Sequence, residues 1–186
     1  MNIWASILKC FGWEVKITAE QRNKCVICVA PHTSNWDFII GLLAYRSKGR
    51  KANFLMKKFW FFFPLGILLK HLGGIPVNRK PKQGKSSYSL TESIISRFKE
   101  TDYMNLAVTP EGTRSARAEW KTGFIYIALG AGVPIQLGII DYKNKQVIIN
   151  DEFIPTGDVQ TDIELIKTFY SNYKQAAKYP ENFLTF

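Results

Sequence analysis

One short polar segment lies between two apolar runs and contains both a histidine and an aspartate. It reads PHTSNWD at residues 31–37 and places His32 five positions before Asp37. On a turn after a strand the two side chains can meet, so that the carboxylate holds one imidazole nitrogen and leaves the other free as a base. An imidazole with a pKa of about 6.5 suits proton abstraction from a hydroxyl at neutral pH. The alternative makes Asp37 a helix cap and His32 an incidental loop residue.

A second polar segment, TPEGTRS at residues 109–115, follows another apolar run. Its centre supplies a carboxylate, a flexible backbone, a hydroxyl and a guanidinium, at Glu111, Gly112, Thr113 and Arg114. A guanidinium can bind a phosphate through two parallel hydrogen bonds. The alternative is a solvated turn with an internal ion pair between Glu111 and Arg114.

A third candidate is GGIPVNR at residues 73–79, where a short apolar stretch ends two positions before Arg79. Taken alone, this arginine is surface charge. Nucleotide-binding motifs lack support in the sequence. The stretch that ends in GKSS has Arg79 where a phosphate loop needs a glycine, and no GxGxxG follows an expected strand.

The elements that must position these segments alternate between β-rich runs and helical stretches. This alternation predicts an α/β fold, with one mixed, mostly parallel sheet flanked by helices and the chemistry in loops at strand ends. A stripe of apolar residues within 3–11 adds a short N-terminal amphipathic helix. We interpret residues 1–186 as a single domain. Strands are expected at 24–30, 52–56, 75–77, 105–109, 135–141 and 146–150, and helices at 36–47, 87–99, 122–129 and 163–177, with a broken helix over 59–71.

Taken together, and with VPIQL at residues 133–137, the three segments resemble the ordered sequence blocks of the glycerolipid acyltransferase family. The best-known members of that family are 1-acylglycerol-3-phosphate acyltransferases. PHTSNWD resembles the HxxxxD block, GGIPVNR the Gly-to-Arg block and TPEGTRS the EGTR block, and the resemblance covers residues 26–140. The chain departs from the family pattern at Pro31, Asn78 and Leu137, where asparagine, aspartate and a second proline are usual.

The resemblance implies an acyltransferase that moves a fatty acyl group from a coenzyme A or acyl-carrier-protein thioester to a lysophospholipid hydroxyl, in phospholipid biosynthesis. His32 is implied as the base and Asp37 as the group that orients it. The thioester is a co-substrate, and neither a cofactor nor a metal ion is implied. Because like charges repel, Glu111 is expected to hold an arginine or a substrate hydroxyl instead of a phosphate. Substrate binding is implied for Arg79, Glu111, Gly112, Thr113 and Arg114.

Positive charge is concentrated in the first half of the chain. Residues 1–99 hold 17 basic and 4 acidic side chains, a net charge of +13, whereas residues 100–186 carry a net charge of −3. Such a field attracts phosphates, anionic thioesters, nucleic acid or an anionic bilayer. Since the aromatic residues lie mostly in apolar runs and do not alternate with basic ones, we expect no nucleic-acid partner.

The longest apolar run, FWFFFPLGILL at residues 59–69, is shorter than the roughly 20 residues that a membrane-spanning helix needs. It is either an interfacial segment with aromatic side chains at the acyl boundary or a buried core segment broken at Pro64. The first interpretation predicts a peripheral or monotopic protein on the cytoplasmic face of the cell membrane. Residues 1–20 are then a candidate membrane-associating segment. The predicted membrane contacts are Trp4, Phe11, Trp13, Phe59, Trp60, Phe61 and Phe62.

Two other functions stay open at this point. One is O-acylation of a lysolipid other than a phosphatidate precursor, such as an amino-acid lipid. The other is a basic, non-catalytic module that binds membranes or nucleic acid.

Three cysteines indicate a reducing, cytoplasmic setting, because their number is odd and the N-terminus lacks the pattern of a secretory signal. Cys25 and Cys28 have CxxC spacing but lie in the apolar run CVICVA. Residues three apart on a strand face opposite sides, so we expect both in the core and not at a metal.

Overall fold

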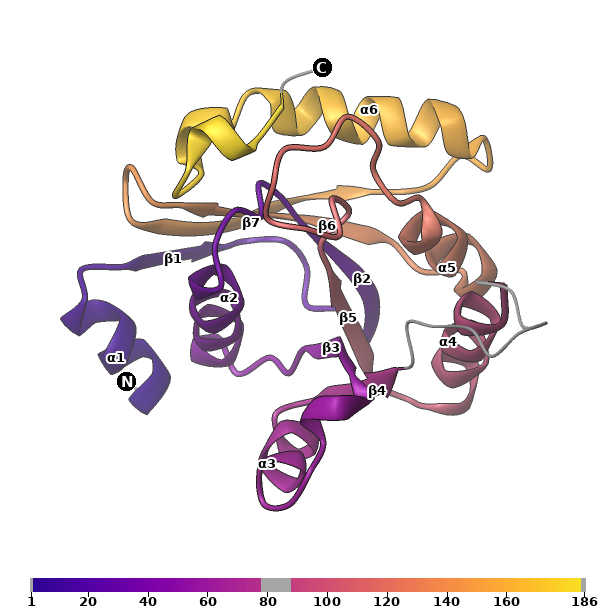
Figure 1. The fold of residues 1–186 in the computed structure, drawn as a ribbon, viewed down its shortest axis with the longest axis horizontal. Coiled ribbons are helices and arrows are strands. Elements are labelled where there is room, and N and C mark those ends of the chain that lie inside the picture. Colours follow the sequence, from indigo (N-terminus) through magenta and orange to yellow (C-terminus); the bar gives the residue numbers. More distant parts are fainter. Residues whose placement is uncertain (1, 78–87, 185–186) are drawn as a thin grey trace.

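A seven-stranded sheet forms the centre of the molecule in the computed structural model, which describes residues 2–77 and 88–184 (Figure 1). The strands are β1 (Glu14–Ile17), β2 (Lys24–Val29), β3 (Asn53–Lys57), β4 (Gly74–Val77), β5 (Met104–Val108), β6 (Ile135–Asp141) and β7 (Gln146–Phe153). They lie in the order β1-β7-β6-β2-β5-β3-β4. The five strands from β6 to β4 run parallel, whereas β7 is antiparallel to β6 and β1 runs with β7. The expected α/β class with a mixed, mostly parallel sheet is confirmed.

Helices cover both faces of this sheet. On one face, α1 and α2 bury Leu8 and Ile40 against Ile140 of β6. On the other face, α4, α5 and α6 contribute Phe98 and Tyr170 among others to the larger core. The helices of the described residues are α1 (Ile3–Cys10), α2 (Trp36–Ser47), α3 (Leu65–His71), α4 (Tyr88–Glu100), α5 (Gly123–Ala131) and α6 (Val159–Ser171), with 3₁₀ turns η1 (Lys58–Trp60), η2 (Lys174–Ala176) and η3 (Pro180–Asn182).

The central strand β2 explains the run CVICVA. A parallel strand with helices on both faces is apolar along its whole length and does not alternate. Cys25 and Cys28 are both fully buried, and they belong to core clusters on opposite faces of the sheet. The prediction that these cysteines are core residues is therefore confirmed.

The parallel register brings the chemical segments to one edge of the sheet. Cys28 of β2 pairs with Val108 of β5, and Val29 pairs with Gly138 of β6. β2 and β5 therefore end together, whereas β6 continues three residues further to Asp141. The chain that follows each of these strands emerges at the edge formed by their carboxyl ends. This is where ligands bind in open α/β sheets.

Some expected elements differ from the observed ones. The strand β1 was not expected. It has only four residues, EVKI, two of them charged, and it is an edge strand of the sheet. The strand β7 continues to Phe153, three residues past its expected end. The last helix lies at Val159–Ser171, earlier than expected at both ends. Asp158 fixes its start by accepting the N–H groups of Gln160 and Thr161.

Most large side chains of the apolar run at residues 59–69 are exposed, although Leu69 is buried, so the alternative of a buried core segment is wrong. The run folds into η1 and α3, which project from the body of the sheet as a lobe of residues 58–71, hereafter the α3 lobe (Figure 1). Gly66 lets the lobe close on itself, because a Cβ there would lie 2.6 Å from the carbonyl oxygen of Phe61. No helix among residues 2–77 and 88–184 combines the length and the apolar character needed to span a bilayer. The exposed large side chains of the lobe are Phe59, Trp60, Phe62, Phe63, Ile67 and Leu68.

Candidate active site

The side chains of His32 and Asp37 meet as predicted. Imidazole Nδ1 lies 3.0 Å from Oδ2 of Asp37, and the same oxygen accepts the backbone N–H groups of Thr33 and Ser34 at 3.0 and 2.9 Å. Asp37 lies in the first turn of α2, where the helix dipole favours negative charge. Its side chain is 3% exposed and that of His32 is 18% exposed. With Nδ1 facing the carboxylate, Nε2 is the nitrogen left to act as a base.

Tyr142 is a candidate site residue that the sequence analysis missed. It directly follows β6, and its hydroxyl donates to Oδ1 of Asp37 at 2.6 Å. Burial, together with this hydrogen bond, raises the pKa of Tyr142, so the hydroxyl stays protonated and remains a donor. Its position at a strand end was visible in the sequence, but nothing there indicated a partner 105 positions away. Both carboxylate oxygens of Asp37 therefore accept hydrogen bonds.

Glu111 connects the loop after β5 to the loop after β2. It is 2% exposed, and its Oε1 accepts the backbone N–H of His32 at 2.8 Å. Its other oxygen, Oε2, is buried and has no hydrogen-bond partner among the described residues. We expected Glu111 to hold an arginine or a substrate hydroxyl. Its partner in the structure is instead the main chain of His32, which makes it a positioning residue.

The remaining residues of the EGTR block lie on the turn after β5. Gly112 has φ = 65°, in the left-handed region that favours glycine. Thr113 accepts the N–H of Ser115 within the turn. Arg114 is exposed and donates through Nη1 to Oδ1 of Asn35, so it connects this block to the HxxxxD block. The structure thus brings these two blocks together, whereas the predicted substrate contact Arg79 lies outside the described residues.

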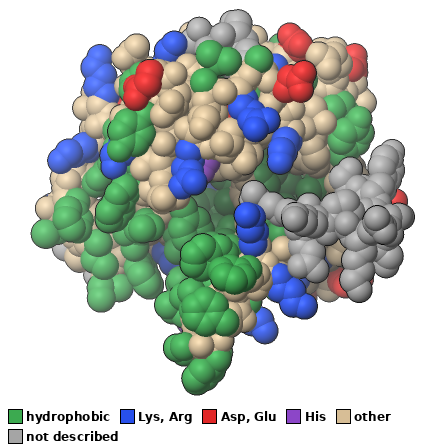
Figure 2. Space-filling view, in the orientation of Figure 1, with side chains coloured by type: hydrophobic (Ala, Val, Ile, Leu, Met, Phe, Trp, Pro, Cys, Tyr) green, Lys and Arg blue, Asp and Glu red, His purple; other side chains and the backbone are tan. Residues whose placement is uncertain are grey.

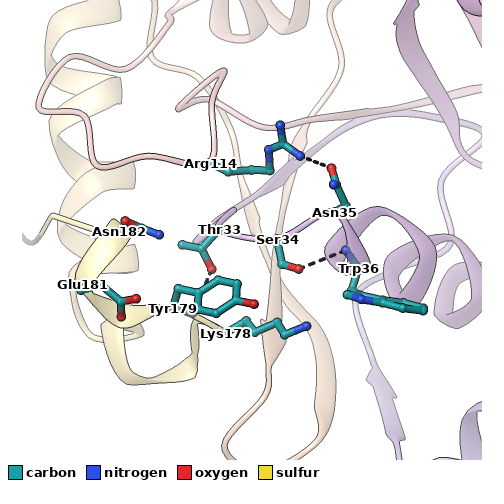
Figure 3. Close-up of a pocket in the computed structure, with 9 residues that line it drawn as sticks. All are labelled: Thr33, Ser34, Asn35, Trp36, Arg114, Lys178, Tyr179, Glu181 and Asn182. Carbon is teal, nitrogen blue, oxygen red and sulfur yellow. Dashed lines mark hydrogen bonds between the residues drawn. The ribbon is translucent and has the colours of Figure 1, made fainter.

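A polar pocket of about 620 Å³ is lined by Thr33 and Ser34, the two residues that follow His32, whereas His32 itself is not part of the lining. Three separate segments line it, and Figure 3 shows their side chains converging on the chain at Thr33 and Ser34. One segment comes from the C-terminal region and is tied to the site, because the Tyr179 N–H donates to Oγ1 of Thr33 at 3.2 Å. Among the described residues, no three His, Cys, Asp or Glu side chains group closely enough to hold a metal ion. The lining residues are Thr33, Ser34, Asn35, Trp36, Arg114, Lys178, Tyr179, Glu181 and Asn182.

Replacing Glu111 with glutamine is expected to flatten the pH dependence of stability. Burial raises the pKa of Glu111 from 4.5 to about 8, the His32 N–H lowers it and Asp37 raises it. Between these values the folded protein keeps a proton that the unfolded chain releases. The free energy of unfolding therefore falls as the pH rises, by up to about 1 kcal/mol per pH unit. Urea denaturation of Glu111→Gln at about pH 5, 6, 7 and 8 should lose this contribution, since the amide carries no titrating proton.

The difference in slope between wild type and variant isolates Glu111 from all other titrating groups. The glutamine carbonyl can still accept the His32 N–H, so the variant should fold. Equal slopes for both proteins would show that Glu111 is ionised in the folded state throughout this range.

Comparison with known proteins adds an independent finding. A family model described as Acyltransferase matches residues 14–137, about two thirds of the chain. A search of curated proteins found no match. The matched region includes His32, Asp37 and Glu111. It ends before Tyr142 and before residues 178–182, which form the C-terminal wall of the pocket.

Proposed function

The chain belongs to the Acyltransferase family and is an acyltransferase, and from this premise we propose that it acylates a lysophospholipid such as 1-acylglycerol-3-phosphate. The proposed donor is a thioester of coenzyme A or acyl carrier protein, and the proposed role is in phospholipid biosynthesis. The observation that carries the proposal is the His32–Asp37 pair, held at 3.0 Å beside a polar pocket. A non-catalytic binding module would not need a buried carboxylate with two backbone donors and a tyrosine fixed on it.

In the proposed reaction, Nε2 of His32 takes the proton of the acceptor hydroxyl while that oxygen attacks the thioester carbonyl carbon. A carbon–oxygen bond forms and the carbon–sulfur bond breaks. The departing sulfur receives the proton back from the imidazolium, so the histidine is regenerated. Asp37 keeps the imidazole oriented and stabilises its charged form. This sequence of steps needs no protein nucleophile.

The acceptor must also be held with its hydroxyl near Nε2. We propose that Arg79 and Arg114 bind its phosphate, as the family resemblance implies. The exposed guanidinium of Arg114 and its contact with Asn35 support this for the EGTR block. Orientation of this kind can lower the barrier by several kcal/mol.

The proposal is tested with purified protein, labelled acyl-coenzyme A or acyl carrier protein, and a panel of lysolipids. The panel includes 1-acylglycerol-3-phosphate, a lysophosphatidylethanolamine and an amino-acid lysolipid, and mass spectrometry identifies each product. We expect a diacyl product that carries the phosphate. Free fatty acid without any lipid product would indicate a thioesterase and overturn the proposal. A product from the amino-acid lysolipid alone would replace the proposed acceptor.

We also propose that the α3 lobe holds the enzyme at the cytoplasmic face of an anionic membrane. Phe59 and Phe63 are 78% and 83% exposed, and the exposed residue Lys58 directly precedes Phe59 in η1. Figure 2 shows hydrophobic side chains over this lobe, below a hollow in the same face that Lys and Arg side chains border. Aromatic side chains at the acyl boundary with basic groups beside them suit interfacial binding.

The predicted membrane contacts near the N-terminus differ in how exposed their side chains are. Phe11, at the end of α1, is 68% exposed. Trp4 is half-buried with Arg46 over its ring, and Trp13 is half-buried against Tyr142. We therefore expect the lobe and Phe11 to contribute more to membrane binding than these two tryptophans.

Replacing Phe59, Phe62 and Phe63 together with serine is expected to weaken vesicle binding at least about a hundredfold. Full burial of a phenylalanine side chain contributes roughly 1.5–3 kcal/mol. The triple variant would lose most of this contribution to the free energy of membrane binding at each of the three positions. Sedimentation with anionic vesicles measures the partition coefficient. The matched control carries three serines at other exposed apolar positions, Tyr126, Ile154 and Leu165. Equal binding by both triple variants would contradict the proposed role of the lobe.

A further inference from the structure

The C-terminal wall of the pocket is an integral part of the fold. The Tyr142 N–H donates to the carbonyl of Ala176 at 2.8 Å, and Tyr179 bonds to Thr33. Phe183, just beyond the wall, is 1% exposed in the core beside Trp120. The chain at residues 178–182 is thus fixed against the HxxxxD block, although it lies outside the part that the family model matches.

Lys178 is the cation of this wall, and aromatic rings hold it. Its Nζ lies 5.9 Å from the ring centroid of Trp36, 5.8 Å from that of Tyr142 and 5.6 Å from that of Tyr179. Rings at these distances attract an ammonium group without neutralising its charge. In the described part of the chain, no carboxylate lies within ion-pair distance of Lys178. One of the three rings belongs to Tyr142, which also holds Asp37, so this charge lies close to the catalytic pair.

A second cation lines the pocket from the other direction. In Figure 3, Arg114 lies above the Thr33–Ser34 segment and Lys178 lies below it. The guanidinium of Arg114 has five N–H donors, and one of them is hydrogen-bonded to Asn35. Two cations against the single carboxylate of Glu181 leave the lining positive. Most other lining groups are hydroxyls or amides, which suit a hydrated anion better than an acyl chain.

We infer that Lys178, which lines this pocket opposite Arg114, binds a phosphate group of one substrate. The inference rests on the proposed function and adds to it a binding residue from the C-terminal segment. The shared chemistry is a phosphate, which has two sources in the reaction. One is the phosphate of the thioester donor, and the other is the phosphate of the lysolipid acceptor.

The test removes the charge of Lys178 and measures the KM of each substrate with and without its phosphate. Lys178→Met keeps the aliphatic stem among the rings, and Lys178→Arg restores the charge. Lys174→Met, four positions earlier in η2 and outside the pocket lining, is the matched control. The donors compared are decanoyl-coenzyme A and the phosphate-free decanoyl-N-acetylcysteamine. The acceptors compared are 1-acylglycerol-3-phosphate and 1-acylglycerol.

We expect Lys178→Met to raise the KM of one phosphate-bearing substrate about tenfold, with little change for its phosphate-free counterpart. Lys178→Arg should recover most of this loss. A rise for decanoyl-coenzyme A identifies the donor phosphate, and a rise for 1-acylglycerol-3-phosphate identifies the acceptor phosphate. Unchanged KM values, or equal increases with and without phosphate, overturn the inference. Wild-type transfer in the same assay tests the proposed function separately, so the two failures are distinguishable.

Discussion

Replacing His32 with alanine is expected to lower kcat for acyl transfer roughly 10³- to 10⁴-fold. In the proposed reaction the imidazole is the group that takes the proton from the acceptor hydroxyl. Its side chain is partly exposed, so its loss leaves a small space at the surface and not a core cavity. The measurement is initial-rate kinetics with saturating thioester and acceptor dispersed in detergent.

The chain contains one other histidine, and it provides the control. His71→Ala changes an exposed residue at the end of α3 and should leave kcat near the wild-type value. Thermal unfolding and vesicle binding of His32→Ala should also match wild type. A His32→Ala variant that retains more than about a tenth of wild-type kcat would remove this residue from the role of base.

Substitution of Asp37 is expected to separate its orienting role from its charge. Oδ2 alone accepts His32 Nδ1 and the N–H groups of Thr33 and Ser34. In Asp37→Asn, the side-chain oxygen must occupy this position, because an amide nitrogen there would face two backbone donors. The imidazole then keeps its orientation and its tautomer, the negative charge is lost, and the Tyr142 hydroxyl must accept from the amide nitrogen where it now donates to Oδ1. We expect kcat to fall roughly 10- to 100-fold, as for the loss of one charged hydrogen bond.

Asp37→Ala is expected to be worse than Asp37→Asn in two respects. The imidazole loses its only orienting side chain, so kcat should fall roughly 10³-fold or more. The buried N–H groups of Thr33 and Ser34 also lose their acceptor, at a cost of about 1–3 kcal/mol each in the free energy of unfolding. Kinetics and urea denaturation of both variants provide the comparison. If Asp37→Asn were as inactive as Asp37→Ala, the amide would have turned its nitrogen toward the imidazole.

The expected results would assign separate tasks to the residues around the His32 imidazole. Asp37 orients the ring, and Glu111 fixes the backbone of the same residue from another strand end. Tyr142 occupies the remaining oxygen of Asp37 and contributes one ring to the site of Lys178. A change at Tyr142 therefore affects both the base and the proposed phosphate site.

Local patterns in the sequence determined the class of fold and the catalytic pair. The helix over residues 36–47 and the strand over residues 135–141 have the bounds expected from their apolar patterns. His32 and Asp37 are five positions apart on one turn, so their meeting depends only on the chain between them. These features depend on residues that are close together along the chain, so the sequence alone is enough to predict them.

The tertiary structure alone decided what surrounds that pair and which apolar residues are exposed. Glu111 reaches His32 across 79 positions, Tyr142 reaches Asp37 across 105, and Tyr179 reaches Thr33 across 146. These contacts follow from the order of the strands, which places distant segments at one sheet edge. The sequence of an apolar run such as residues 59–69 does not indicate whether another element packs on it. Its exposure in the α3 lobe therefore depends on the whole fold, because burial is a property of what the rest of the chain covers.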